Sequence, residues 1–511
     1  MKKLYKVLIL LLPVVLCFSY FPVISLGKSE TMNFELSLPL VWLVVFDVVA
    51  LVEVIRNKKI GLIFRNWWWL SFPAFATMAI LWSDNMIRGV LTCGIMWLIY
   101  FAIFAFVALK ENVWDERFRK YFWRVFFAAA LMACVWCVVQ CILDVVGVPR
   151  ENSLMCEGCV SEMFGFPHPN GFAIEPQFMG NLLLAPAIVA GWFLISGTSL
   201  RSGSRPSGPS PRADGVPSRA AALRNPLAEA DVPPAKKRQS FSWRRRQTWC
   251  GLFFFVIAST LFLTFSRGAI YAFIVAMIFM TALMMVRMKS ARSLILWPVI
   301  ILSFVVTLNL QGLLAEVGPT NDTYVDGVSK VINHLSLGII DLRGGDVSEG
   351  DEIDDGSAVR ENEQDVQNTQ DTQDAVFDGY VEESTNIRMR LTEAAMTVWA
   401  SDFRTAMVGV GIGGAGQAMF DAGETDSPKE IVQNEYASLL VEVGVVGMAL
   451  VIFTAVMVVR WVIKNGGESS PLLLTVMLAY AVTLMFFSGF ANALQVYLLP
   501  AVLAVVCGRG K

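Results

Sequence analysis

Residues 89–109 read "GVLTCGIMWLIYFAIFAFVAL" and contain no charged side chain. As a helix this stretch would be about 30 Å long, which matches the hydrocarbon thickness of a bilayer. Similar apolar runs recur along the 511-residue chain, which is 55% hydrophobic and only 16% charged. A soluble protein of this length would need more polar residues to cover its surface. The sequence therefore predicts an all-α, polytopic integral membrane protein.

Twelve apolar runs are assigned as transmembrane helices. They cover residues 7–25, 36–55, 67–82, 89–109, 125–147, 177–197, 248–265, 269–287, 294–312, 436–459, 471–488 and 493–508. Short connections such as "RNKK" at 56–59 and "RMKSAR" at 287–292 all fall on one side, which the positive-inside rule makes cytoplasmic. Both termini are expected on that side. The start of the chain lacks a small-residue cleavage site, so it is interpreted as the first span rather than a secretory signal.

Two polar segments separate the membrane helices of residues 1–197, 248–312 and 436–511. Residues 198–247 hold 11 Lys/Arg against 3 Asp/Glu and many Ser and Pro, which predicts a disordered cytoplasmic linker. Residues 313–435 form a large extracytoplasmic loop before the last three spans. Its part 313–385 has 18 Asp/Glu and 3 Lys/Arg and is expected to be an acidic spacer. Its part 386–435 regains helical periodicity, with an apolar stripe of Leu391, Ala394, Ala395, Val398 and Trp399, and is expected to be ordered.

Two further motifs lie in expected outer loops. "VGVGIGGAGQ" at 408–417 contains G-x-G-x-x-G, but no βαβ unit accompanies it, so a dinucleotide site is rejected. Close approach of this backbone to a substrate or to a neighbouring helix remains open. "CEGC" places Cys156 and Cys159 in a loop without further ligands at zinc spacing, which favours a local disulfide.

The assignment of the membrane spans places several polar groups on the extracytoplasmic side. They are Arg88, Arg267, Arg388, Arg390 and Arg404, together with Ser266, Glu175 and the two histidines, His168 and His334. No nucleotide-binding or metal-binding motif stands out, and guanidinium groups pair bidentately with phosphate, so an anionic lipid head group is the expected ligand. Each arginine can instead be a snorkelling anchor, and His168 can simply shape its loop. Transport is the main competing function, and it predicts charged residues in mid-membrane.

Several segments together resemble a known family. They are "AILWSDNMIRGVL", "GFAIEPQFMGNLLLAP", "TFSRGAIYAF" and "RMRLTEAAMTVW" followed by "VGVGIGG". In this order they resemble the O-antigen ligase and polysaccharide polymerase superfamily of the bacterial inner membrane. The resemblance implies about twelve spans and an outer loop before the final helices, without a metal or other cofactor. It implies transfer of a glycan from undecaprenyl pyrophosphate to a hydroxyl of lipid A core, of another glycan or of protein. No nucleic-acid partner is expected.

The ligase motif of this family is His, then Asn, Ser or Gln, nine residues, Gly, two residues, then Gly, Thr or Tyr. Here Gln433, Asn434, Gly444 and Gly447 match every position except the histidine. An amide cannot accept a proton at neutral pH, so Gln433 cannot be a general base. The departure favours a polymerase over a ligase, and a flippase for a lipid-linked or anionic substrate remains the alternative.

The resemblance also implies roles for individual residues. Arg267, with Arg388 or Arg390, would bind the pyrophosphate, and Arg88 and Ser266 are the further substrate-binding candidates. The first candidates for a catalytic base are Glu435 and Glu175, and the second is His168. Alternatively, Gln433 and Asn434 only orient the acceptor sugar through hydrogen bonds.

Overall fold

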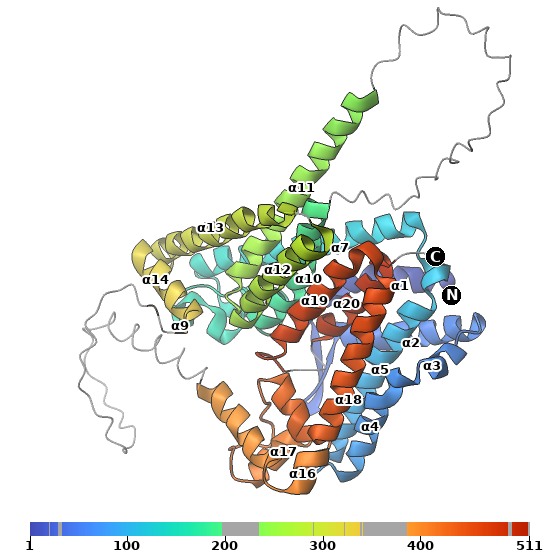
Figure 1. Ribbon diagram of the computed structural model, residues 1–511. Coiled ribbons are helices and arrows are strands. Elements are labelled where there is room, and N and C mark those ends of the chain that lie inside the picture. Colours follow the sequence, from blue (N-terminus) through green and yellow to red (C-terminus); the bar gives the residue numbers. More distant parts are fainter. Residues whose placement is uncertain are drawn as a thin grey trace, which may run out of the picture.

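The computed structural model describes residues 1–19, 21–28, 33–196, 235–289, 291–320, 322–337, 340, 386–488 and 493–508. In these ranges the chain is almost entirely helical, and Figure 1 shows the helices packed as one bundle. Seven helical segments are long and apolar enough to cross a membrane. They contain α2 (Leu38–Arg56), α5 (Met86–Ala108), α7 (Glu116–Val145), α10 (Pro176–Ser196), α12 (Arg267–Met288), α13 (Leu296–Val317) and α18 (Glu435–Asn465). The helical, polytopic prediction is confirmed, and the number of twelve spans stays a prediction.

The other expected spans also fall on helices, which are shorter, interrupted or less apolar. They are α1 (Lys2–Cys17), α4 (Ser71–Ala79), α11 (Ala235–Leu263), α19 (Ser470–Thr483) and α20 (Leu494–Cys507). The predicted span 67–82 is divided, because short 3₁₀ turns η1 (Trp67–Leu70) and η2 (Ile80–Trp82) flank α4.

The predicted first span extends too far. Residues 23–25 lie in β1 (Val23–Lys28), which pairs antiparallel with β2 (Asn33–Ser37) in a hairpin that the sequence did not predict. Helix α1 ends earlier, at Cys17, and Pro22 disfavours helical geometry at Phe21, so a helix is not expected to continue into residues 23–25.

Short elements complete the described chain. They are α3 (Gly61–Arg65), α6 (Lys110–Val113), α8 (Arg150–Ser153), η3 (Glu157–Cys159), α9 (Ser161–Phe164), η4 (Ala291–Ile295), α14 (Tyr324–Leu335), α16 (Phe403–Val408), α17 (Ala415–Asp421) and η5 (Gly467–Ser469). A further helix covers residues 386–399, and it buries Leu391, Ala394, Ala395 and Val398. Its predicted apolar stripe is confirmed.

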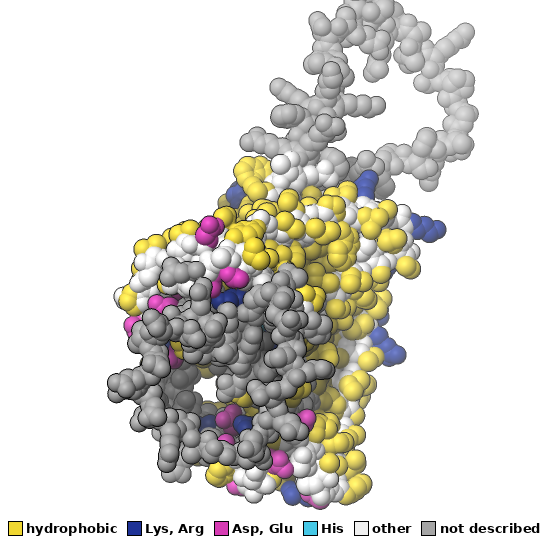
Figure 2. All heavy atoms as spheres, turned by 90° about the vertical axis from the view of Figure 1, so that its left-hand side faces the viewer, with side chains coloured by type: hydrophobic (Ala, Val, Ile, Leu, Met, Phe, Trp, Pro, Cys, Tyr) yellow, Lys and Arg dark blue, Asp and Glu magenta, His cyan; other side chains and the backbone are white. Residues whose placement is uncertain are grey.

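Helix α10 forms the centre of the bundle. Nearly all of its side chains are buried, and it packs against α11, α12 and α19. A helix that is apolar all round has to lie inside a protein or face lipid. The outer helices do face the surroundings with apolar side chains, and Figure 2 shows hydrophobic atoms over much of the visible surface. Val286, for example, is 80% exposed.

The two chain ends lie at one end of α7. The Lys6 Nζ is 2.6 Å from an Asp115 carboxylate oxygen, and a Cβ built on Gly508 would lie 2.7 Å from the Lys110 Nζ. The other end of α7, about 45 Å away for 30 residues, leads to a disulfide between Cys156 and Cys159. Figure 1 shows the termini at one edge of the bundle and α9 and α14 at the opposite edge. The predicted disulfide is confirmed, and the cytoplasmic placement of the termini stays a prediction.

The glycine-rich segment packs on a break in α18. The Val410 N–H donates to the Val441 carbonyl oxygen, and the Gly411 N–H donates to that of Glu442, both at 2.9 Å. Helix α18 is interrupted at Gly444, which has φ 62° and ψ −170°. Residues 409–416 therefore approach a neighbouring helix, which is one of the two alternatives that the sequence left open.

The division into membrane and loop parts stays a prediction. Residues 198–234 of the linker and 341–385 of the acidic spacer lie outside the described residues. Residues 235–247, which the sequence assigned to the linker, are helical and form the start of α11. Figure 1 shows this start projecting beyond the bundle.

Candidate functional site

A cavity of about 650 Å³ lies at the end of the bundle that carries the disulfide. Segments far apart in sequence form its wall: the loop before α10, the connection from α11 to α12, α14, the helix at 386–399 and Gln433 before α18. Six of the candidates named from the sequence line it: His168, Glu175, Ser266, Arg267, Arg388 and Gln433. The fold thus brings most of the expected site residues to one place.

Arg267 is the first residue of α12 and projects from a tight connection. Helix α11 ends at Leu263, and Phe265 in the turn has the left-handed φ of 48°. Ser266 caps α12, since its Oγ accepts the Ala269 N–H at 3.4 Å. Left-handed backbone at a non-glycine residue is costly and concentrates at functional sites. The predicted tight turn at Arg267 is confirmed, and its place on the extracytoplasmic side stays a prediction.

Helix N-termini converge on this cavity. Helices α10 and α12 start at Pro176 and Arg267, and both residues line the cavity. Helix α18 starts at Glu435, two residues after Gln433, which also lines it. The first N–H groups of a helix carry partial positive charge and favour anions. Arg388 lies close enough to Arg267 for the two cations to repel each other, so an anion between them would relieve that repulsion.

The two histidines lie in an aromatic box at the wall of the cavity. Their ring centroids are 5.3 Å apart, and Phe164, Phe166 and Phe265 surround them. The His334 Nε2 lies 3.1 Å from the Phe265 carbonyl oxygen, so this nitrogen carries the proton of the neutral ring and Nδ1 is the acceptor.

Burial holds both histidines neutral. Desolvation, the neighbouring His334 and the positive charge of Arg267 place the pKa of His168 well below its usual value. Desolvation and then Arg267 lower the pKa of His334 to about 3. Neutral imidazoles can accept or donate one hydrogen bond in this cavity without adding charge to it.

The neutral histidines predict a loss of stability in mild acid. Below pH 6.5 the unfolded chain protonates both histidines and the folded chain does not, so the free energy of unfolding should fall by about 1.4 kcal/mol per pH unit for each of them. Thermal unfolding of the detergent-solubilised protein between pH 7.5 and 5 measures this slope. A His168→Asn, His334→Gln double variant should flatten it, and an unchanged slope in that variant would contradict the assignment.

The candidate bases differ in their access to the cavity. Glu175 is exposed and lines it. Glu435 is buried and does not line this cavity, and its backbone N–H donates to the Leu484 carbonyl oxygen at 3.0 Å. Asn434 is the N-cap of α18, where its Oδ1 accepts the N–H groups of Tyr436 and Ala437 at 3.0 and 3.3 Å. The geometry favours Glu175 over Glu435 as the residue that meets a substrate.

Two arginine candidates lie apart from the cavity. Arg88 lies in the first turn of α5 beside the glycine-rich segment, with its Nη1 3.3 Å from a Cβ built on Gly416. Arg390 is exposed and does not line the cavity, although it is two residues from Arg388. The structure therefore separates Arg88 and Arg390 from the Arg267 cluster.

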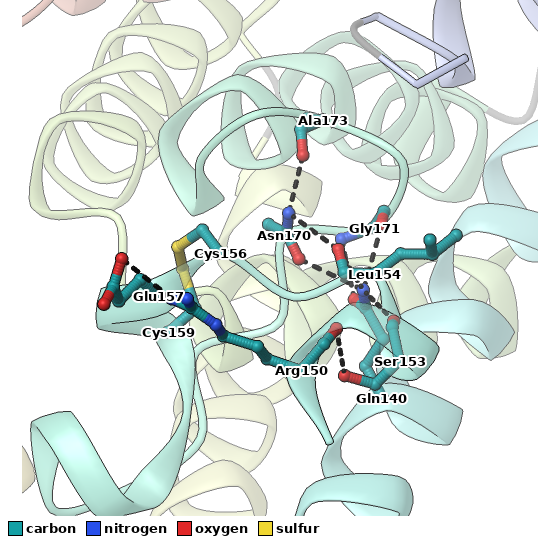
Figure 3. Close-up of a disulfide and its surroundings, with 10 residues drawn as sticks. All are labelled: Gln140, Arg150, Ser153, Leu154, Cys156, Glu157, Cys159, Asn170, Gly171 and Ala173. Carbon is teal, nitrogen blue, oxygen red and sulfur yellow. Dashed lines mark hydrogen bonds and ion pairs between the residues drawn. A yellow bond between two sulfur atoms is a disulfide. The ribbon is translucent and has the colours of Figure 1, made fainter. Parts of the chain in front are cut away.

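Gln140 organises the loop that carries His168 and Glu175, and the sequence analysis missed it. Figure 3 shows its side chain among the loop backbone. The Gln140 Nε2 donates to Asn170 Oδ1 at 3.1 Å and to the Gly171 carbonyl oxygen at 3.0 Å, while Oε1 accepts the Gly171 N–H at 2.8 Å. The sequence feature that could have identified Gln140 is its position as a lone amide inside the apolar run "WCVVQCIL".

The disulfide and Gln177 fix other parts of the wall. The Cys159 carbonyl oxygen accepts the His168 N–H at 2.8 Å, so the disulfide turn in Figure 3 positions that histidine.

The Gln177 Nε2 donates to the Phe486 carbonyl oxygen at 2.6 Å and ties the start of α10 to the segment after α19. Gln177 was also missed, although it follows Glu175 and Pro176 at the start of a predicted span.

Comparison with known proteins shows a family to which part of the chain is similar. Residues 252–452 match the family model described as O-antigen ligase. No curated protein compared with the chain matches it significantly. The matched segment includes Arg267, Arg388, Gln433 and Asn434, and it ends within α18. In this segment the chain is similar to the O-antigen ligase family, which agrees with the resemblance found in the sequence motifs.

Proposed function

We propose that the protein transfers or polymerises a glycan from undecaprenyl pyrophosphate on the extracytoplasmic face of the bacterial inner membrane. Its family supports a membrane glycosyltransferase-type function in polysaccharide assembly. The observation that carries the finer proposal is the cavity in which Arg267, Arg388 and the starts of α10 and α12 meet. Such a concentration of positive charge suits a pyrophosphate, and its place at the end of a membrane-spanning helix suits a donor anchored in lipid.

The reaction requires two forms of assistance. The acceptor oxygen forms a bond to the anomeric carbon, and the bond from that carbon to the pyrophosphate oxygen breaks. Negative charge then grows on the leaving pyrophosphate, where Arg267 and Arg388 would stabilise it. The hydroxyl proton passes to a base, for which Glu175 is the exposed carboxylate of the cavity. The Gln433 amide would orient the acceptor sugar by hydrogen bonds.

Glu175→Gln is expected to lower kcat for transfer by about 10²–10⁴-fold, because the amide keeps the shape of the side chain and cannot accept a proton. Steady-state transfer with a purified donor and acceptor measures this effect. Glu435→Gln is the matched control, and its kcat should stay within a few-fold of wild type. If both variants fold and only Glu435→Gln loses activity, the general base is Glu435 and not Glu175.

Reconstitution in vesicles tests the proposed function itself. The protein is given an undecaprenyl-pyrophosphate glycan, and the products are separated by size and by acceptor. Longer glycans identify a polymerase, and transfer to lipid A core identifies a ligase. The mismatch at Gln433 leads us to expect longer glycans. An unchanged donor that has crossed the bilayer would replace the proposal with a transporter.

One observation favours that alternative. Asp47 lies within α2 and is 6% exposed, and neither carboxylate oxygen has a hydrogen-bond partner among the described residues. A buried carboxylate within a membrane helix is frequent in transport proteins. The Asp47→Asn variant separates the two functions, since transfer should persist in it if the protein is a glycosyltransferase.

A further inference from the structure

A separate apolar cavity of about 200 Å³ lies between α5, α18 and α20. Its wall includes Val107 of α5, Trp461 of α18 and Ala504 of α20, and it shares no lining residue with the cavity at the disulfide-bearing end. The Asn66 amide in this wall already donates to the Leu62 carbonyl oxygen at 3.3 Å. The cavity therefore suits a hydrocarbon better than a polar ligand.

The 3₁₀ turn η1 connects α18 to α5 at this cavity. The Trp67 ring stacks on Phe453 of α18 with centroids 6.5 Å apart, and the Trp69 ring packs against Tyr100 of α5 at 4.8 Å. Trp68 and Trp69 both line the cavity. Tryptophan is enriched where the hydrocarbon of a bilayer meets the polar head groups. These rings thus suit the level at which the chains of a lipid join its head group.

A lysine lies where the cavity wall continues toward the chain termini. On α20 the wall residue Ala504 is one turn before Gly508, and a Cβ built on Gly508 would lie 2.7 Å from the Lys110 Nζ. On α5 the wall residue Val107 is three positions before Lys110. Both helices therefore place the Lys110 ammonium group about one helical turn from the cavity.

A second cation lies beside this half-buried lysine. Desolvation and then the positive charge of Arg119 lower the pKa of Lys110, against a smaller opposing effect of Glu111. An anion next to Lys110 and Arg119 would relieve the repulsion between them. An apolar space with a cationic neighbour on the side of the termini matches the two parts of an anionic lipid.

We propose that this cavity binds one acyl chain of an anionic phospholipid from the leaflet nearest the chain termini, with the lipid phosphate beside Lys110 and Arg119. A peptide is a poorer occupant, because its backbone N–H and C=O groups would find few partners in the apolar wall. The bound lipid is distinct from the glycan donor, whose pyrophosphate we assign to Arg267. It would hold η1 against α5 and α18, which the cavity separates.

Phosphatidylglycerol and phosphatidylcholine with identical acyl chains test the cationic part of this site. The detergent-purified, delipidated protein is titrated with each lipid, and bound lipid is counted by mass spectrometry of the intact complex. Wild type should bind one phosphatidylglycerol at least ~5-fold more tightly than phosphatidylcholine, since each cation near an anionic lipid contributes about that factor. Lys110→Ala should reduce this preference ~5-fold and leave phosphatidylcholine binding unchanged. Arg287→Ala, which removes an exposed cation from the last turn of α12, is the matched control and should keep the wild-type preference.

Val107→Trp tests the apolar part by filling the cavity. Val107 is 40% exposed, so the fold should tolerate the larger side chain. The variant should bind both lipids ~10-fold or more weakly, because apolar contacts carry factors of that size. Phosphatidylglycerol should raise the thermal unfolding midpoint of wild type, as a ligand of the folded state does, and should do so less in Val107→Trp. Val275→Trp is the matched control, since Val275 is 41% exposed in α12 and does not line this cavity.

Three results would overturn the inference. The first is equal binding of the two lipids by wild type, and the second is wild-type binding in Val107→Trp. The third is tighter binding of undecaprenyl phosphate than of phosphatidylglycerol, lost in Val107→Trp, which would assign the cavity to a polyprenyl chain. All of these measurements are made without a glycan donor, so their outcome does not depend on the proposed function.

Discussion

Replacing Arg267 by alanine is expected to lower kcat for glycan transfer by about 10²–10³-fold, the usual cost of removing one group that stabilises transition-state charge. Arg267 begins α12 at the wall of the cavity. The guanidinium acts where charge grows on the leaving pyrophosphate, so the loss should appear in kcat more than in KM. Arg267→Lys should recover part of the rate, because lysine keeps the charge and loses the bidentate fork.

The neighbouring arginines provide the control for this prediction. Arg388 lines the cavity and Arg390 does not, although both lie on the helix at 386–399. Arg388→Ala should therefore reduce transfer strongly, and Arg390→Ala should stay within a few-fold of wild type. Wild-type kcat in a folded Arg267→Ala variant would remove the proposed pyrophosphate role. A large loss in Arg390→Ala alone would show that the arginine pair had been assigned wrongly.

Gly444→Ala is expected to destabilise the fold by roughly 3 kcal/mol or more. The residue has φ 62° and ψ −170°, a region that costs other residues about 1–3 kcal/mol. A Cβ at this position would also lie 2.4 Å from the carbonyl carbon of Met407, and backbone cannot move aside as a side-chain end can. The added strain should lower the thermal unfolding midpoint by several degrees and reduce the yield of folded protein.

Gly94 offers the matched control for this substitution. It lies inside α5, and a Cβ built on it meets nothing within 4 Å. Gly94→Ala should leave the unfolding midpoint unchanged or raise it slightly, since alanine favours helix by up to about 1 kcal/mol. Equal midpoints for Gly444→Ala and Gly94→Ala would show that α18 can straighten at Gly444. The motif match at Gly444 would then have no structural cause.

Much of the architecture follows from local sequence. Runs such as residues 89–109 had to be helices at membrane depth, because a lipid environment leaves backbone groups no partner outside the segment. The stripe of Leu391, Ala394, Ala395 and Val398 likewise fixed one face of the helix at 386–399. The side-chain amide of Gln433 does not accept a proton at neutral pH, so residue type alone excludes Gln433 as a general base. Each of these properties depends on residue type and on neighbours within a few positions.

The composition of the site was decided only by the tertiary structure. The sequence favoured Arg267 with either Arg388 or Arg390 among five outer arginines, and packing brought Arg267 and Arg388 to one cavity while leaving Arg88 and Arg390 outside it. It also turned Glu435 inward and exposed Glu175. Hydrophobic periodicity determines which face of a helix is buried, and it carries no information on which helix ends meet. That meeting depends on contacts between residues far apart in the sequence, such as Gln177 and Phe486, which are 309 positions apart, and these contacts exist only once the bundle has packed.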